Sequence, residues 1–409
     1  MREILLINVA GEDKPGITSA VSRVLDEHGA DILDIGQAVI HDNLNLGILV
    51  MIPDGQQSAL VQKEILFSLH AMDMRVRFQS ISESSYEHWV EQQGKPRHIV
   101  TLLARRVAAH HIARVTAVTV EQGLNIDKIT RLSGRVPLER IEANTKACVE
   151  FSLRGIPVDL TALRASLLEL SAELDIDVAY QEDNIYRRNR RLVVFDMDST
   201  LIEAEVIDEL AKEAGVGDEV AAITDAAMDF EASFAERMKL LRGLDESVLA
   251  AVAARLQLTE GAENLMSTLR MLGYRTAILS GGFDYFARHI QKQLGIDYIY
   301  ANHLEVVDGQ VTGRVCGEVV DGQRKAQLLR EIAASENISL EQVIAVGDGA
   351  NDLPMLSIAG LGIAFRAKPL VKATAKQSIS KLGLDGILYL MGLSDRDTLL
   401  WQHEQLLSS

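Results

Sequence analysis

Three short apolar runs in the second half of the chain are each followed at once by side chains that can do chemistry. The side chains that follow residues 192–195, 274–279 and 343–346 are, in order, Asp196 and Asp198, Ser280, and Asp348 with Asn351 and Asp352. Two aspartates one residue apart on an extended segment point the same way. Their charges repel unless a cation or a shared proton compensates them. Each motif alone is typical of a tight turn, but three in this order favour one common site.

The elements that would position these side chains are buried parallel strands. Strands and helices alternate from residue 274 onward, which predicts a doubly wound parallel sheet of the Rossmann-like α/β class. The carboxyl ends of such strands meet at one crevice, where Lys325, at a helix start, would join them. Four amphipathic helices with no strand between them are predicted at 203–215, 217–228, 230–241 and 246–256. They indicate a helical cap inserted at about 203–258.

The side chains at this crevice favour a hard metal ion and an anionic ligand. Carboxylates without paired histidine or cysteine are the ligands that Mg²⁺ prefers. Gly281 and Gly282 follow Ser280, so backbone N–H groups can approach an anion at a helix start. The sequence therefore predicts a magnesium site that also binds an anionic group.

The first half of the chain contains one unit twice. Strand, helix, strand, strand, helix and strand follow one another over residues 1–84, and the order recurs over 96–182. Gly29 and Gly123 end the first helix of each copy. A repeat of this length indicates a duplicated domain, here of the ferredoxin-like βαββαβ type. The polar residues 82–96 are the predicted join, and the catalytic domain would span 190–409.

Composition narrows the class of protein. The chain has 409 residues, 47% of them hydrophobic, and a formal net charge of −17. That charge argues against nucleic acid or an anionic membrane as a partner. Two cysteines are too few for a disulfide framework. No apolar run reaches the roughly 18 residues of a membrane helix. We expect a cytoplasmic enzyme, in which the arginines of residues 187–191 form a solvated linker.

These motifs resemble those of a known superfamily. Asp-x-Asp-Ser-Thr at 196–200, Ser-Gly-Gly-Phe at 280–283, Lys325 and Gly-Asp-Gly-Ala-Asn-Asp at 347–352 resemble the four motifs of the haloacid dehalogenase (HAD) superfamily. Glu205 and the Asp-Phe-Glu-x-Ser-x-x-x-Arg run at 229–237 are similar to phosphoserine phosphatases within it. The two N-terminal units resemble ACT domains, which commonly bind amino acids. The whole arrangement resembles the long, mycobacterial-type form of the phosphatase.

The resemblance implies a reaction: Mg²⁺-dependent hydrolysis of O-phospho-L-serine to L-serine and phosphate, the last step of serine biosynthesis. Asp196 would be the nucleophile that forms an aspartyl phosphate, and Asp198 the general acid and base. Mg²⁺ would be bound by Asp196, Asp348 and the backbone carbonyl of Asp198. The implied substrate-binding residues are Glu205, Arg237, Ser280, Gly281, Lys325 and Asn351. Thr200, Asp352 and Phe230 would support them.

The ACT resemblance implies regulation and pairing. An amino-acid effector, with L-serine as the first candidate, would bind near Asp13 and Gly16 in the turn after the first strand. A homodimer through these domains is expected. The second copy departs from the pattern, because residues 105–111 replace this turn. The alternative to effector binding is that both copies serve only to form the dimer.

Three further alternatives stay open at this stage. The enzyme could act on another small phosphomonoester, or pass the phosphoryl group to homoserine. The chain could also be an amino-acid-sensing regulator whose catalytic half is vestigial. The family usually has a few more residues between Met228 and the run that begins at Asp229, so no contact from that loop can be assigned.

Overall fold

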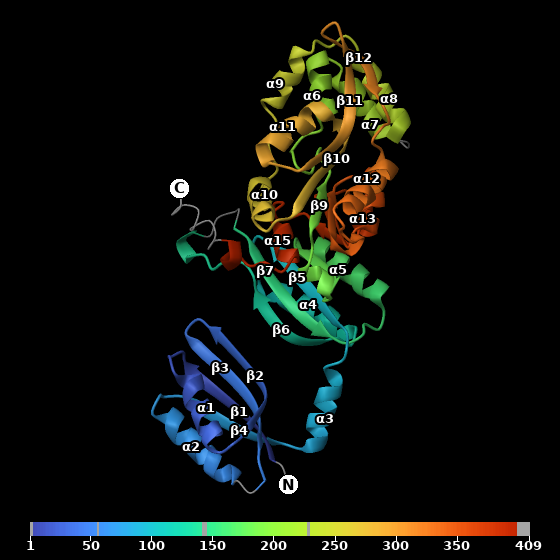
Figure 1. Ribbon diagram of the computed structural model, residues 1–409. Helices are drawn as coiled ribbons and strands as arrows, with labels where there is room; N and C mark the ends of the chain where they lie inside the picture. Colours follow the sequence, from blue (N-terminus) through green and yellow to red (C-terminus); the bar gives the residue numbers. More distant parts are fainter. Residues whose placement is uncertain (1–2, 55–56, 141–144, 227–229, 399–409) are drawn as a thin grey trace. The chain divides into compact units, whose positions relative to one another are not determined.

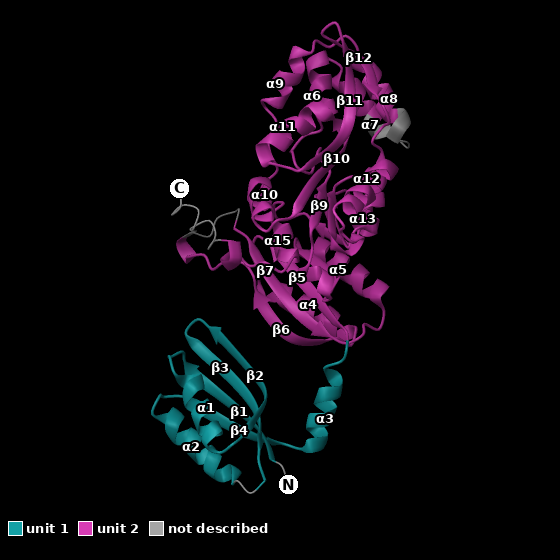
Figure 2. Cartoon of the chain, viewed as in Figure 1, with its two compact units in different colours: residues 1–95 teal, residues 96–409 magenta. Residues whose placement is uncertain are grey.

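The structure is a computed structural model whose backbone is described for residues 3–54, 57–140, 145–226 and 230–398. The chain divides into two compact units, residues 1–95 and residues 96–409 (Figure 2). Three sheets are present in the described residues, one in the first unit and two in the second (Figure 1). No helix in these ranges is long and apolar enough to cross a membrane.

The first unit is a single βαββαβ fold. Its elements are β1 (Glu3–Glu12), α1 (Ile17–Glu27), β2 (Asp31–Ile40), β3 (Asn43–Ile52), α2 (Ser58–His70) and β4 (Arg75–Ile81). The antiparallel sheet has the order β2-β3-β1-β4. Alternate residues of β3, such as Ile48 and Val50, are fully buried with Val21 of α1 and Ile65 of α2. This alternation is what one covered face of a sheet requires.

The predicted join contains a helix that the sequence analysis did not foresee. Helix α3 spans Glu83–Gln92, and the Ser82 side chain caps it by accepting a hydrogen bond from the Ser85 N–H. None of the residues of α3 is buried. Because no face of the helix is buried, its sequence has little apolar periodicity. The Ser82 cap was the one sequence feature that could have indicated a helix here.

The second unit begins with another βαββαβ fold. Its elements are β5 (Arg97–Ala104), α4 (Ala109–Glu121), β6 (Asn125–Arg131), β7 (Ala147–Arg154), α5 (Leu160–Leu174) and β8 (Asp177–Glu182). The order β6-β7-β5-β8 repeats that of the first sheet. Unlike β1, strand β5 is buried at every position after Arg97. Leu103 and Cys148 belong to the same apolar cluster as Tyr389 near the C-terminus, so both faces of this sheet are covered.

The third sheet is the predicted doubly wound parallel sheet. Its strands, in the order of the sheet, are β12 (Gln310–Cys316), β11 (Tyr298–Val307), β10 (Arg275–Phe283), β9 (Leu192–Phe195), β13 (Val343–Gly347), β14 (Leu361–Phe365) and β15 (Gln377–Ile379). All pairs are parallel except β11 with β12. That pair is a hairpin whose turn residues, Asp308 and Gly309, both have positive φ.

Helices cover both faces of this sheet. Helices α10 (Ala262–Met271) and α11 (Asp284–Leu294) pack with Val193 and Ile278 on one face. Helices α12 (Gly322–Ser335) and α13 (Leu353–Ile358) pack with Val194 and Ala277 on the other. Because successive strand residues alternate between the two clusters, β9 is buried completely and its carboxyl end is rigidly placed.

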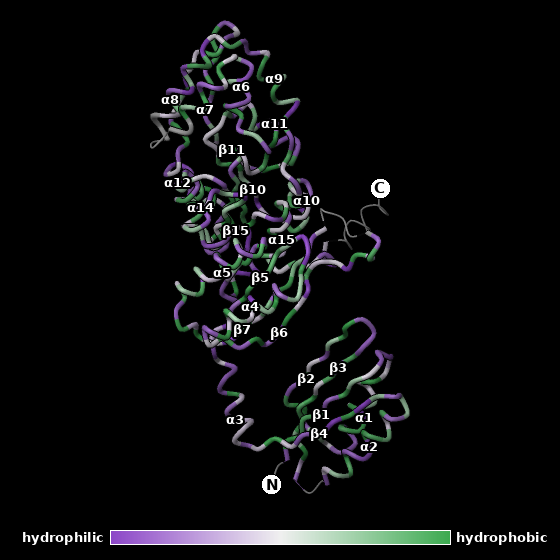
Figure 3. The backbone as a smooth tube through the Cα atoms, turned by 180° about the vertical axis from the view of Figure 1, so that it is seen from behind, coloured by the Kyte–Doolittle hydropathy of each residue, from purple (hydrophilic) through white to green (hydrophobic). Residues whose placement is uncertain are grey.

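The cap lies between β9 and α10, as predicted. It consists of α6 (Val206–Ala214), α7 (Gly217–Ala226), α8 (Phe230–Leu240) and α9 (Ser247–Ala253). Figure 3 shows hydrophilic and hydrophobic stretches alternating along these helices, as expected for helices with one buried face. The two segments that join the cap to the sheet pair with each other at Ile202 and Leu258. We call this pairing, residues 201–203 with 257–259, the cap hinge.

The second βαββαβ fold is docked on the third sheet through the edges of β8 and β15. The Gln377 side chain accepts a hydrogen bond from the Tyr180 N–H (2.9 Å) and donates one to the Tyr180 carbonyl. The carboxylate of Asp177 accepts from the backbone N–H groups of Ser380 and Lys381 (2.8 and 2.7 Å). These contacts satisfy an exposed strand edge, which explains why residues 96–409 form one unit.

The predicted solvated linker at residues 187–191 is wrong for two of its four arginines, whereas Arg188 and Arg191 are exposed as predicted. Arg187 and Arg190 are buried. Arg187 forms an ion pair with Glu150 of β7, and Arg190 donates to the backbone carbonyl of Glu341. A run of like charges usually faces solvent, but these two arginines lie between packed folds that supply a carboxylate and a carbonyl.

Candidate active site

The predicted chemistry-bearing residues meet around one cavity of about 500 Å³ at the carboxyl edge of the third sheet. The predicted residues that line it are Asp196, Asp198, Glu205, Arg237, Gly281, Asp348 and Asn351. They come from the ends of β9, β10 and β13 and from the cap. A larger cavity of about 1120 Å³, between α8 and β12, contains none of these motif residues. Chemistry, and not size, therefore identifies the site.

Asp196 is held by a buried cation. Its Oδ1 lies 2.8 Å from Nζ of Lys325, and the same oxygen accepts the Met197 N–H at 2.8 Å. Lys325 is fully buried, and its Nζ also contacts Oδ1 of Asp352 at 2.7 Å. Among the described residues no hydrogen bond reaches Oδ2 of Asp196. That oxygen is therefore available to attack an electrophile.

Burial sets the protonation of this trio. Burial and then Asp352 raise the pKa of Asp196 to about 7, although Lys325 opposes the shift. Burial works to lower the pKa of Lys325, but the two carboxylates outweigh it and hold that pKa above its usual range. Lys325 is therefore a permanent cation at the floor of the site.

Asp198 has no cation of its own. It is buried, and its Oδ1 has no hydrogen-bond partner within the described part of the chain. Burial, followed by the charges of Glu205 and Asp196, raises the pKa of Asp198 well above its usual range, against a hydrogen bond from the Val206 N–H. This shift favours the protonated form of Asp198, which is the form that a general acid needs.

Three carboxylates are placed to share a metal ion. One oxygen from each of Asp196, Asp348 and Asp352 lies within 4.8 Å of the others. Burial and the neighbouring Asp196 raise the pKa of Asp348 to about 8, as expected for like charges that lack a cation. The Thr200 hydroxyl lies 3.4 Å from Oδ1 of Asp348 and orients it. An oxygen-only cluster of this kind fits a hard divalent ion.

Asp352 is the least free of the three. Its Oδ1 accepts from Lys325, and its Oδ2 accepts the Gly349 N–H at 3.0 Å. It is fully buried. Both of its oxygens therefore already bind protein donors, so Asp352 has less capacity for a metal ion than Asp196 and Asp348.

The end of β10 forms a tightly packed cradle. Ser280 is fully buried, and its Oγ accepts the Gly282 N–H at 2.9 Å. A Cβ on Gly282 would lie 2.7 Å from Oδ2 of Asp198 and 3.1 Å from the Ser280 Oγ. Asn302 braces this segment by donating to the Gly281 carbonyl at 2.8 Å. Sequence reasoning missed Asn302, because nothing in β11 marks it as different from a surface residue.

The cap contributes two carboxyl side chains and one guanidinium group to the cavity. Glu205, at the start of α6, accepts the Ser199 hydroxyl at 2.8 Å, and burial raises its pKa. Arg237 of α8 is buried and lines the same cavity. Asp208, one turn after Glu205, also lines it, and its Oδ1 is buried without a partner in the described ranges. The sequence analysis did not select Asp208, although its spacing from Glu205 puts both on one helix face.

Two expectations about the cap cannot be compared with the structure. The side chain of Phe230 and the junction of Met228 with Asp229 lie outside the described residues.

The turn expected to bind an effector is open. Asp13 and Gly16 are exposed between β1 and α1. Gly16 has φ 96°, a conformation that favours glycine, and a Cβ there would contact nothing within 4 Å. The Asp13 N–H donates to the Asp42 carbonyl at 2.8 Å, so the turn between β2 and β3 lies beside this segment. In the second copy residues 105–111 replace this turn, and Arg105 at its start contacts Glu260.

Family models match three segments of the chain. A haloacid dehalogenase-like hydrolase model matches residues 193–357, which contain the cap and the ends of β9, β10 and β13. Two ACT-domain models match residues 3–79 and 96–181, which are the two βαββαβ folds.

Relatives extend the similarity over nearly the whole chain. The phosphoserine phosphatase of Streptomyces coelicolor is 40% identical over 394 residues, which cover 95% of this chain and 92% of the relative. The phosphoserine phosphatase SerB2 of Mycobacterium tuberculosis is 38% identical over 395 residues, 95% of this chain and 93% of the relative. A solved structure described as a probable phosphoserine phosphatase from Vibrio cholerae, unliganded form, has a TM-score of 0.57 and 31% identity. It covers 76% of this chain and 90% of its own.

Proposed function

This chain belongs to the phosphoserine phosphatases of the haloacid dehalogenase-like hydrolase family, and on that premise we propose which of its residues hydrolyse O-phospho-L-serine. The observation that carries the proposal is the pair Asp196 and Asp198. One is anchored through Oδ1 on the Lys325 ammonium, and the other is buried without a cation. A nucleophile and a general acid need these two different surroundings.

The reaction proceeds in two steps. Oδ2 of Asp196 attacks phosphorus, and the bond to the serine oxygen breaks while Asp198 donates its proton to that oxygen. This leaves an aspartyl phosphate on Asp196 and an ionised Asp198. Asp198 then takes a proton from a water molecule that attacks the aspartyl phosphate, which releases phosphate and restores both carboxyl groups.

The site also fits a magnesium ion. Asp196, Asp348 and the backbone carbonyl of Asp198 would bind it, and the ion, when bound, neutralises negative charge on the phosphoryl group. Lys325, the Ser280 hydroxyl, the Gly281 N–H and Asn351 would contact the phosphoryl oxygens. Thr200, which donates to Asp348, would orient that carboxylate, and Asp352, which accepts from Lys325, would position the ammonium.

Specificity belongs to the cap in this proposal. The amino-acid end of the substrate carries one ammonium and one carboxylate group. Glu205 would accept the ammonium, and the Arg237 guanidinium would bind the carboxylate. Phe230 would form an apolar lid over the substrate, an assignment that rests only on the resemblance of residues 229–237 to phosphoserine phosphatases.

Two substrates test this assignment. p-Nitrophenyl phosphate has a phosphoryl group but no amino-acid end. Glu205→Gln and Arg237→Met are expected to raise KM for O-phospho-L-serine at least about tenfold, the effect of one lost charged hydrogen bond. Hydrolysis of p-nitrophenyl phosphate should stay near the wild-type rate. Equal losses on both substrates would contradict the assignment.

The N-terminal half would regulate this reaction. In the proposed division, residues 1–84 and 96–182 are ACT domains, and residues 190–409 are the catalytic domain with a cap at about 203–258. L-Serine is the proposed effector, at the open turn of Asp13 and Gly16. Serine inhibition that persists unchanged when residues 1–95 are removed would contradict this.

A homodimer in the cytoplasm completes the proposal. Strand β2 is an edge strand of its sheet, and Ile32, Ile35 and Ile40 on it are exposed by 47%, 49% and 74%. Such an edge favours pairing with a second copy. The cytoplasmic location is supported by the two cysteines, both of which are free thiols.

A further inference from the structure

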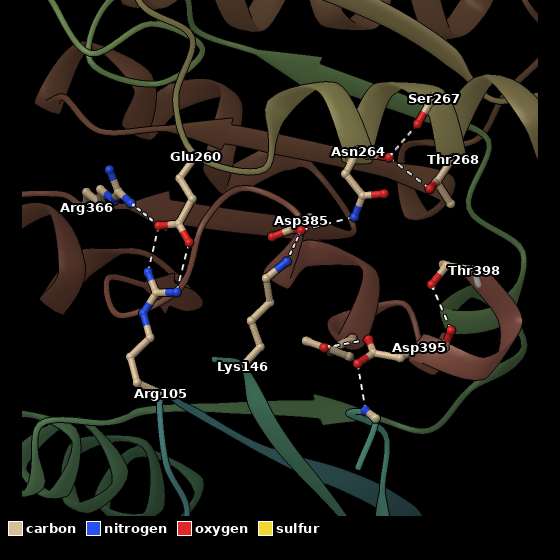
Figure 4. A network of polar contacts seen from close by, with 12 residues as sticks. Arg105, Lys146, Glu260, Asn264, Ser267, Thr268, Arg366, Asp385, Asp395 and Thr398 are labelled. Atoms are coloured by element: carbon tan, nitrogen blue, oxygen red, sulfur yellow. Dashed lines mark hydrogen bonds and ion pairs between the residues drawn. The ribbon is translucent and has the colours of Figure 1, made fainter. Parts of the chain in front are cut away.

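The second ACT domain contacts the catalytic domain next to the cap hinge. Arg105 follows β5, in the turn where the first copy has Asp13 and Gly16. Its two terminal nitrogens donate to the two carboxylate oxygens of Glu260, at 2.8 and 2.6 Å (Figure 4). Paired donors and acceptors of this kind fix orientation as well as distance. Arg105 therefore holds the Glu260 side chain in one position.

Glu260 is the residue after the returning half of the hinge. The Glu203 N–H donates to the Gln257 carbonyl at 3.0 Å, and the Thr259 N–H donates to the Leu201 carbonyl at 2.9 Å. These hydrogen bonds and the bridge of Ile202 with Leu258 join the two segments by which the chain enters and leaves the cap. The cap also pairs with β12, where Asp245 bridges Gln310. Glu260, which Arg105 holds, is one position from the pairing of the entering and leaving segments, where a hinge motion of the cap would be centred.

Arg366 links the same carboxylate to the other half of the hinge. It follows β14 and donates to Glu260 at 3.2 Å (Figure 4). It also donates to Glu203 at 3.5 Å. Glu260 therefore accepts two guanidinium groups, one from each domain. The arrangement lowers the pKa of Glu260, chiefly through its hydrogen bonds with Arg105, so the carboxylate is charged at neutral pH.

A second contact braces the segment that follows. Lys146, just before β7, forms an ion pair with Asp385, which also accepts the Asn264 side-chain N–H at 3.0 Å (Figure 4). A Cβ on Gly261 would lie 2.5 Å from Oδ1 of Asp385. The chain between the hinge and α10 is therefore closely packed against a residue that the second ACT domain holds.

We propose that Arg105 is a positioning residue of the phosphatase. By holding Glu260, it sets the hinge and with it the place at which the cap presents Glu205 and Arg237 to the substrate. The inference rests on the proposed role of those two residues. It makes the second ACT domain a structural part of the catalytic site, in addition to any role in binding an effector.

The test compares two substrates in the full-length chain. Arg105→Ala is expected to raise KM for O-phospho-L-serine about fivefold. This is the largest change in affinity expected from an ion pair whose side chains are 32% and 33% exposed. The kinetics of p-nitrophenyl phosphate should not change, because that substrate does not engage Glu205 or Arg237. Arg105→Lys should recover part of the loss. In a Glu260→Ala background, Arg105→Ala should add nothing.

The chain offers a matched control. Arg114 and Glu173 form the same two-pronged pair at 2.8 and 2.6 Å, within the second ACT domain. Arg114→Ala should leave both substrates unaffected. Equal losses on both substrates in Arg105→Ala, with a lowered melting temperature, would show a merely structural role and overturn the inference, as would no change at all. Failure of the wild type to release phosphate from O-phospho-L-serine would instead overturn the proposed function.

Discussion

Asp196 and Asp198 are two residues apart, yet their surroundings give them different chemistry. Lys325 lies 2.8 Å from Asp196, whereas no cation contacts Asp198 among the described residues. Burial raises the pKa of both, and Lys325 opposes the rise directly at Asp196, whereas Asp198 also faces the charge of Glu205. One carboxyl group paired with an ammonium, beside another that is buried without a cation, is the arrangement expected of a nucleophile and an acid.

Replacing the acid should stop the second step. Asp198→Asn keeps the shape of the side chain but cannot pass a proton to the leaving serine or take one from water. We expect kcat to fall by about 10² to 10⁴. Any aspartyl phosphate that forms should persist and be detected on Asp196 by mass spectrometry. Asp127→Asn in β6 is the control, and a normal kcat in Asp198→Asn would contradict the assignment.

Metal binding should depend on pH. The pKa values of about 7 and 8 for Asp196 and Asp348 mean that both carboxyl groups are largely protonated at pH 6 in the absence of metal. Metal ligands must be ionised, so binding releases these protons. Magnesium affinity should therefore rise with pH between about 6 and 8, by up to about tenfold per pH unit for each proton released.

Calorimetry in two buffers of different ionisation enthalpy measures this release. An affinity that does not change with pH, with no proton released, would show that these carboxyl groups are not the ligands.

The end of strand β10 illustrates how an element limits its own sequence. Gly282 approaches Asp198 and Ser280 so closely that a methyl group would overlap both. Gly282→Ala should displace these side chains, at a cost of about 1–3 kcal/mol in unfolding free energy, and lower kcat. Gly36→Ala in β2 is the matched control, since a Cβ there meets nothing within 4 Å. A fully active Gly282→Ala enzyme would contradict the packing described.

Sequence reasoning succeeded where the signal is local. The ends of the strands, the two βαββαβ repeats and the four cap helices follow from periodicity, and the meeting of Asp196 with Lys325 follows from motifs. It failed where distant residues decide the outcome. Arg187 became buried because Glu150 is supplied by another fold. Asn302 and Arg105 act through partners that are remote in the chain, which no spacing rule reveals.

At the scale of the whole molecule, the second ACT domain belongs with the catalytic domain. Leu103, Cys148 and Ala179 lie in the same apolar cluster as Leu390 and Phe195. Residues 96–409 accordingly form one compact unit, separate from residues 1–95. Part of the catalytic domain's apolar surface is covered by the domain that precedes it.

Truncation should expose this dependence. A chain that begins at residue 96 is expected to fold and to hydrolyse O-phospho-L-serine. A chain that begins at residue 183 leaves part of that cluster open to solvent, so it should melt at a lower temperature and aggregate. Calorimetric melting of the two truncated chains beside the full-length protein measures the difference. Equal melting temperatures would contradict the shared core.

Phosphate release from O-phospho-L-serine, measured for wild type and Asp196→Asn with Mg²⁺ and with EDTA, tests the central claim most directly. The amide of Asp196→Asn lacks the negative charge of the attacking oxygen. Because the amide has nearly the same size as the carboxylate, the packing around Lys325 should be preserved. We predict release by the wild type only when Mg²⁺ is present, and none by Asp196→Asn under either condition. Undiminished release by Asp196→Asn would contradict the aspartyl phosphate mechanism.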